Sequence, residues 1–199
     1  MKIIAFEGLD KAGKNTLARY YVDYLTNQGY KVGFMDFHRY STPTGKIIKD
    51  WLYGEYDADQ ETIELIMAAD KLAAKQDIEF LRKEEYDFLI LDRYKWSQYA
   101  YSLASGYPKE KADYLNEMIP STDFTVYVHV SPETSMSRKG KHGDNDRYES
   151  DLHLLTRVRD NYNRLATIHN TTTLVIEGEQ PVEMMKSEFM MKIKQLGLI

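Results

Sequence analysis

The chain reads Gly8-Leu9-Asp10-Lys11-Ala12-Gly13-Lys14-Asn15-Thr16 directly after its first apolar run, and an amphipathic segment follows. Glycines near both ends of this stretch let the backbone wrap around an anion, and Lys14 adds a mobile cation. A helix that starts here also points its first unpaired N–H groups at the anion. The stretch therefore predicts a phosphate-binding loop for a nucleoside triphosphate, with contacts from Gly8, Lys11, Ala12, Gly13, Lys14, Asn15 and Thr16.

The residue after Lys14 departs from the usual pattern of such loops. They carry Ser or Thr there as a magnesium ligand, whereas this chain has Asn15, with Thr16 one position late. An amide oxygen is a weaker ligand than a hydroxyl in that geometry. We therefore expect Mg2+ to depend on Asp10, Asp92 and Asn15, partly through water.

Short apolar runs alternate with segments whose apolar residues recur three and four positions apart. The runs are continuous, which is typical of parallel strands covered on both faces. We predict strands over residues 2–7, 31–37, 87–92, 124–130 and 173–177. We predict helices over residues 16–28, 58–84, 95–104 and 151–169, with Gly29 ending the first in a left-handed cap. This order predicts a three-layer α/β/α fold of the P-loop NTPase type, with a five-stranded parallel sheet and ligands beyond the carboxyl ends of its strands.

The composition limits the class of protein. The chain has 199 residues, 43% hydrophobic and 29% charged, and no linker-like stretch divides it, so we expect one domain over residues 1–199. The net charge of -5 argues against a nucleic-acid partner. The N-terminus reaches charge and glycine too early for a signal peptide, and no apolar run is as long as a membrane span, so we expect no membrane partner and a cytoplasmic location. Because the chain has no cysteine, disulfides and thiolate metal sites are excluded.

A second motif lies at the end of the third predicted strand, where the chain reads Asp92-Arg93-Tyr94-Lys95-Trp96-Ser97-Gln98-Tyr99-Ala100-Tyr101. These residues fit the pattern DR[YFH]-x-x-S-x-x-AY. Together with the loop that follows the first strand, they make the chain closely resemble the thymidylate kinases. The resemblance covers nearly the whole chain, and it implies ATP- and Mg2+-dependent phosphorylation of a deoxynucleoside monophosphate, dTMP.

The resemblance implies roles for Asp10 of the loop and for several residues of the second motif. The fork of Arg93 would grip the acceptor phosphate with two hydrogen bonds, and Asp10 would orient the sugar hydroxyl and the water around the metal. Gln98 would read the polar edge of the base. Tyr101 would pack where a 2′-hydroxyl would sit, and so select deoxyribose. Ser97 belongs to the same acceptor set.

Two further segments resemble the acceptor side of the family. Residues 37–45 are similar to its F-P-x-x-x-T-P-x-G segment, with His38 in place of the proline. The candidate acceptor contacts there are Phe37, Arg39 and Tyr40. In the long middle helix, Met67 and Lys71 stand where the family carries a base-stacking Phe and an Arg. Methionine lacks the ring face and lysine lacks the forked donor, so the choice of base is the least determined part of the prediction.

Residues 138–149 resemble the lid of the family, because they combine cations with glycines and follow its V-x-P-E segment. Arg138 would lie over the adenine. Family members place a transfer-assisting arginine in the phosphate loop or in the lid. This chain has Lys11 at the first place, so we expect Arg147 or a lid lysine, Lys139 or Lys141, to share that work.

The predicted catalytic residues are Lys14, Asp10, Arg93, Lys11 and Arg147. The resemblance also implies a homodimer built on helix contacts, for which the helices after Tyr56 and after Tyr94 are suited. Two alternatives stay open. One is a kinase for another monophosphate such as dUMP, which the altered Met67 and Lys71 positions suggest. The other is a nucleotide-binding switch, which is disfavoured because the chain has no guanine-reading N/T-K-x-D segment and because a switch has no use for the acceptor motif.

Overall fold

The computed structural model describes residues 1–138, 147–148 and 150–198. Within these residues, parallel strands form a five-stranded sheet in the order β2-β3-β1-β4-β5. The strands are β1 (Lys2–Glu7), β2 (Val32–Asp36), β3 (Phe88–Asp92), β4 (Phe124–His129) and β5 (Thr173–Glu177). The register places Phe6 of β1 beside Asp92 of β3 and Val126 of β4. The prediction of a five-stranded parallel sheet is confirmed, and every predicted strand overlaps an observed one.

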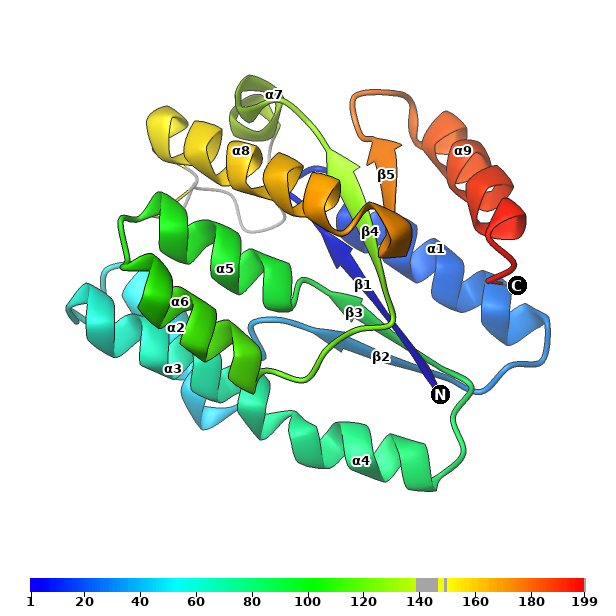
Figure 1. The fold of residues 1–199 in the computed structure, drawn as a ribbon, viewed down its shortest axis with the longest axis horizontal. Helices are drawn as coiled ribbons and strands as arrows, with labels where there is room; N and C mark the ends of the chain where they lie inside the picture. Colours follow the sequence, from blue (N-terminus) through cyan, green and yellow to red (C-terminus); the bar gives the residue numbers. More distant parts are fainter. Residues whose placement is uncertain (139–146, 149, 199) are drawn as a thin grey trace.

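Helices cover both faces of the sheet, as Figure 1 shows. On one side lie α1 (Lys14–Asn27) and α9 (Val182–Gln195), and on the other lie α5 (Lys95–Ala104) and α8 (Leu152–Ile168). The remaining helical elements are α2 (Pro43–Leu52), α3 (Gln60–Ala73), α4 (Lys75–Lys83), α6 (Lys109–Met118), α7 (Pro132–Ser137) and a short 3-10 turn (Asn170–Thr172). β1 is buried on both faces because Ile4 and Phe6 join the core that includes α1, whereas Ile3 and Ala5 join a core that includes α4. The three-layer prediction is therefore confirmed.

The prediction of one long helix over residues 58–84 is wrong. The chain forms α3 and α4, which are separated at Ala74. α3 packs against α2 and α5, whereas Ile78 of α4 belongs to the core beneath β1 and β3. The helix is interrupted at the buried Ala74, which ends α3 with a ψ of -11°. Apolar residues keep helical spacing through the break, which is why periodicity did not reveal it.

Three helices of ten or more residues were not predicted, namely α2, α6 and α9. The start of α2 carries a recognisable signal, since Thr42 accepts a hydrogen bond from Gly45 N and Pro43 takes the first helical position. The predicted left-handed cap after α1 is confirmed at Gly29, where φ is 90°. Among the described residues, no helix is both long enough and apolar enough to cross a bilayer.

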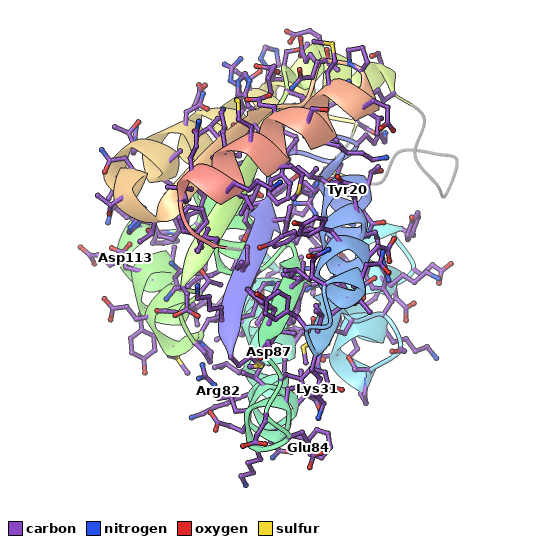
Figure 2. The ribbon with its side chains drawn as sticks, turned by 90° about the vertical axis from the view of Figure 1, so that its right-hand side faces the viewer. Tyr20, Lys31, Arg82, Glu84, Asp87 and Asp113 are labelled. Carbon is purple, nitrogen blue, oxygen red and sulfur yellow. The ribbon has the colours of Figure 1, made fainter. Side chains whose placement is uncertain are left out.

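The amino ends of the strands are closed by a local cluster that Figure 2 labels. Lys31, just before β2, donates its backbone N–H to Asp87 Oδ2 at 2.8 Å, and Asp87 returns its own N–H to the Lys31 carbonyl at 2.8 Å. The Lys31 ammonium also donates to the carbonyl of Glu84. These bonds join the turn between α4 and β3 to the start of β2. The predicted ligand residues lie at the opposite edge, beyond the carboxyl ends of the strands.

Candidate active site

The loop after β1 has the backbone of a phosphate cradle. Lys11 and Gly13 take left-handed conformations with φ of 60° and 101°, and α1 begins immediately afterwards. Gly8 is packed so tightly that a Cβ there would lie 2.3 Å from the Val128 carbonyl oxygen. The Lys14 ammonium turns back and donates to the Leu9 carbonyl at 2.5 Å. Burial and the nearby guanidinium of Arg93 lower the pKa of Lys14 to about 8, although carboxylates oppose the shift.

Asp92, the last residue of β3, has an oxygen that would suit a magnesium ion beside this loop. Asn15 Nδ2 donates to Asp92 Oδ2 at 2.8 Å, and the other carboxylate oxygen, Oδ1, is buried without a hydrogen-bond partner. A carboxylate oxygen in that situation suits a hard cation or its water. Within the described ranges no cluster of three acidic or histidine side chains forms a ready-made cage, so nucleotide oxygens would complete the coordination. Thr16 is exposed on α1.

Arg93 and Asp10 bring the two predicted motifs into contact. Arg93 Nη2 donates to Asp10 Oδ1, and the second oxygen of Asp10 accepts from Tyr101 Oη at 2.9 Å. Burial alone would raise the pKa of Asp10, but Arg93 and Lys14 outweigh it and lower that pKa to about 2. Burial would likewise lower the pKa of Arg93, whereas Asp10 raises it well above its usual range. Both groups therefore stay charged at neutral pH.

The carboxylate of Glu7, which sequence analysis did not identify, anchors the acceptor motif to the end of β1. Glu7 accepts the backbone N–H groups of Tyr94, Trp96 and Ser97 at 2.9 to 3.1 Å, and the Ser97 hydroxyl at 2.5 Å. No side chain of α5 itself caps that helix. Burial raises the pKa of Glu7, although the bonds from Ser97 and the charge of Arg93 oppose the shift. Because Ser97 Oγ also accepts from Arg93 Nη1 at 3.0 Å, Glu7 fixes the guanidinium through Ser97.

A cavity opens beside Arg93, and its empty volume, including the mouth, is about 550 Å³. It is lined by Asp10, Phe37, His38, Tyr40, Leu52, Glu64, Met67, Arg93, Ser97, Gln98, Tyr101 and Tyr148. Most of the predicted acceptor residues are therefore brought together. Sequence analysis missed His38, Leu52, Glu64 and Tyr148. Of these four, only Glu64 could have been predicted, because it lies one helical turn before Met67 and therefore on the same face of the helix.

Two of the predicted acceptor residues do not line the cavity. Lys71 is buried behind it, where its ammonium donates to Gln98 Oε1 at 3.1 Å. Burial lowers the pKa of Lys71 to about 8, although neighbouring carboxylates oppose the shift. Arg39 lies towards α3 and α4, where its guanidinium donates to Asp77 Oδ2 at 2.8 Å and to the Asp70 carbonyl at 3.1 Å.

The lid prediction falls mostly outside the described residues, because 139–146 and 149 are not among them, and this includes Lys139 and Lys141. Arg138 is described, and its guanidinium donates to the Lys11 carbonyl at 3.0 Å and to the Gly178 carbonyl at 2.8 Å. Arg147 lies with its guanidinium 4.4 Å from the ring centre of Trp51 on α2. In this arrangement Arg138 braces the phosphate loop, whereas Arg147 contacts the acceptor side.

The chemistry of the site follows from this geometry. The predicted cradle around Lys14 and the predicted anion site at Arg93 are joined by Asp10, which belongs to the loop and pairs with Arg93. Such a pair of cradles can align two phosphates for transfer of a phosphoryl group.

Comparison with known proteins agrees with this geometry. The family model of thymidylate kinase matches residues 6–189. A probable thymidylate kinase of Archaeoglobus fulgidus is 32% identical over 187 residues, which cover 94% of this chain and 91% of that protein. A thymidylate kinase of Thermoanaerobacter sp. strain X514 is 31% identical over 193 residues, covering 93% of this chain and 92% of that protein.

The fold has a solved counterpart. The structure of thymidylate kinase from Candida albicans superposes with a TM-score of 0.82 at 24% identity, covering 98% of this chain and 91% of that one. At that identity the likeness concerns the fold alone. From the family match and the full-length relatives, we conclude that this chain belongs to the thymidylate kinase family of phosphotransferases.

Proposed function

We propose that this protein transfers the γ-phosphoryl group of ATP to dTMP and releases dTDP and ADP. The observation that carries the proposal is the ion pair between Asp10 of the phosphate loop and Arg93 of the acceptor motif, because it joins the proposed donor and acceptor sites. An oxygen of the acceptor phosphate forms a bond to the γ-phosphorus. The bond from that phosphorus to the β–γ bridging oxygen breaks, and ADP leaves with its electron pair. The acceptor phosphate is already ionised at neutral pH, so no protein base is required.

The donor side uses the loop and the start of α1. The amides around Gly13 and the ammonium of Lys14 would hold the outer phosphates, and Lys11 would add charge near the γ-phosphate. Arg138, whose guanidinium donates to the Lys11 and Gly178 carbonyls, would border the adenine. Asp92 and Asn15 would hold Mg2+, partly through water, and the ion would neutralise charge on the β- and γ-phosphates. Asp10 already uses both its oxygens on Arg93 and Tyr101, so its role at the metal would be indirect.

The acceptor side uses the cavity beside Arg93. The guanidinium would take the monophosphate, with Ser97 holding it in position. Phe37 and Met67 offer apolar surface to the base, and Gln98 offers an amide to its polar edge. Tyr101, held by Asp10, would fill the space of a ribose 2′-hydroxyl and favour deoxyribose.

Family relationship supports two further proposals, a homodimer and a cytoplasmic location. The exposed apolar side chains of Leu65 on α3, Phe80 on α4 and Tyr114 on α6 offer surface for a second copy. Sedimentation of the purified protein tests this. A monomer at micromolar concentration would contradict the dimer.

The function is tested by incubating the purified protein with ATP, Mg2+ and a panel of monophosphates: dTMP, dUMP, dCMP and the ribonucleotide UMP. We expect dTMP to be the preferred acceptor. If dUMP is preferred, it replaces dTMP as the proposed acceptor, and the protein is still a monophosphate kinase. Tight ATP binding without transfer to any monophosphate would favour a switch. Lys14→Ala and Arg93→Ala should each lower the rate by orders of magnitude while the circular dichroism spectrum is kept, and near-normal turnover of either would overturn the roles given to these residues.

A further inference from the structure

A buried polar cluster forms part of the wall of the acceptor cavity, at Glu64 and Gln98, and continues behind it. Glu64 and Lys71 come from α3, and Gln98 and Ser102 come from the adjacent α5. Each of these side chains is at most 5% exposed. Burying a carboxylate and an ammonium together is costly unless their hydrogen bonds are well made, so this cluster calls for an explanation beyond stability.

Hydrogen bonds hold the Gln98 amide at both of its ends. Lys71 Nζ donates to Gln98 Oε1 at 3.1 Å, and Gln98 Nε2 donates to Glu64 Oε2 at 2.6 Å. An ammonium only donates, so the atom that faces Lys71 must be the amide oxygen. The carboxylate of Glu64 then accepts a hydrogen bond from the amide nitrogen. The two partners together permit one orientation of an amide that otherwise has two.

Glu64 is itself held in place by further donors. Gln60 Nε2 donates to Glu64 Oε1 at 2.8 Å, and the Ser102 hydroxyl contacts Oε2. The carboxylate therefore accepts three hydrogen bonds from the protein, namely those of Gln60, Ser102 and Gln98. Glu64 is therefore better suited to orient Gln98 than to bind a nucleotide itself.

The orientation of an amide matters for the choice of base. A 4-oxo pyrimidine presents N3–H as a donor and O4 as an acceptor, whereas a 4-amino pyrimidine presents N3 as an acceptor and an amino group as a donor. A freely rotating amide matches either pattern by turning through 180°. A fixed amide matches only one, and the mismatched base leaves buried polar groups unpaired.

We propose that Glu64 is a positioning residue for base selection: together with Lys71 it fixes the Gln98 amide, so that the acceptor site takes 4-oxo pyrimidines and rejects 4-amino ones. This rests on the proposed function, because it assigns the cavity to the base of the acceptor. Glu64 acts through Gln98 and makes no contact with the reacting phosphates.

The test compares kcat/KM for dTMP with kcat/KM for dCMP in the wild-type protein and in Glu64→Gln. The substituted amide no longer presents an obligatory acceptor to Gln98, and it removes the negative charge beside Lys71. We expect the ratio of dTMP to dCMP to fall by about tenfold or more, with the KM for ATP within about twofold of wild type. Gln60→Met is the matched control, because it removes a contact to the other oxygen of Glu64 and leaves the bond to Gln98. Its ratio should match wild type.

The outcomes separate the inference from the function on which it rests. If the wild-type protein transfers no phosphate to dTMP, the proposed function fails whatever the variants do. If it does, and Glu64→Gln keeps the wild-type ratio, the inference alone is overturned. If Glu64→Gln does not fold, Glu64→Asp carries the test, since it keeps the charge but withdraws the carboxylate from Gln98. A lowered ratio in Glu64→Asp supports the inference, and an unchanged ratio refutes it.

Discussion

Replacing Arg93 by lysine separates charge from geometry in the acceptor site. In the structure, one nitrogen of Arg93 pairs with Asp10 while the other donates to Ser97 Oγ at 3.0 Å. Lysine keeps the positive charge but loses the fork, so it cannot keep both anchors and also bind a phosphate with two bonds. The loss of one charge-assisted bond is worth about 2 to 3 kcal/mol. At about 1.36 kcal/mol per tenfold, Arg93→Lys should lower kcat/KM for dTMP by about 30- to 160-fold.

The assay varies dTMP at saturating ATP, and then ATP at saturating dTMP, with ADP formation as the readout. We expect the KM for ATP to stay within about twofold, because the donor cradle is built on Lys14 and the loop amides. Arg157→Lys is the matched control, since Arg157 on α8 donates to the Ala104 carbonyl at 2.8 Å and takes no part in the proposed site. The reasoning would be refuted if Arg93→Lys lowered kcat/KM for dTMP by less than about fivefold, or if it raised the KM for ATP as much as the KM for dTMP.

Three further predictions concern the donor side. The pKa of Lys14 is lowered to about 8, so its ammonium is present below that pH and lost above it. Calorimetric titration between pH 7 and 9.5 should therefore show the affinity for ATP falling by up to about tenfold per pH unit above pH 8. Lys14→Met should lack this dependence on pH. Asp92→Asn should raise the Mg2+ concentration for half-maximal rate by about tenfold or more, and an unchanged magnesium titration would remove Asp92 from the metal site. In Gly178→Ala the new Cβ would lie 2.7 Å from the Ala12 carbonyl oxygen and 2.9 Å from that of His129. We expect a loss of about 1 to 3 kcal/mol in the free energy of unfolding by urea, whereas wild-type stability would show that the loop yields freely.

Features that depend on neighbouring residues in the sequence were predicted well. The loop from Gly8 to Lys14 and the motif that begins at Asp92 are local patterns, and each follows a strand of a parallel sheet. Carboxyl ends of adjacent parallel strands meet at one edge, so the closeness of Asp10 and Arg93 followed from topology. Their residue roles stay predictions until the variants are measured.

Features that depend on pairing between distant segments were not predicted. Glu7 ends an ordinary apolar strand, and its partners lie 87 to 90 residues away, so nothing in its surroundings in the sequence marks it as a cap for α5. Arg39 was assigned to the acceptor because of its segment, but the structure pairs it with Asp77, which belongs to a helix whose separate existence periodicity did not show. The stacking of Arg147 on Trp51 likewise depends on which helix lies opposite.

The packing around Trp51 gives the protein an optical reporter of its own. The chain has two tryptophans, and Trp51 has the guanidinium of Arg147 4.4 Å from its ring centre and Tyr148 at 5.5 Å, both from the segment that precedes α8. Trp96 instead neighbours His169, at 5.8 Å. In a Trp96→Phe background the remaining indole emission would respond to the departure of residues 147 and 148 from α2. Stopped-flow fluorescence could then time that event against phosphoryl transfer without any attached dye.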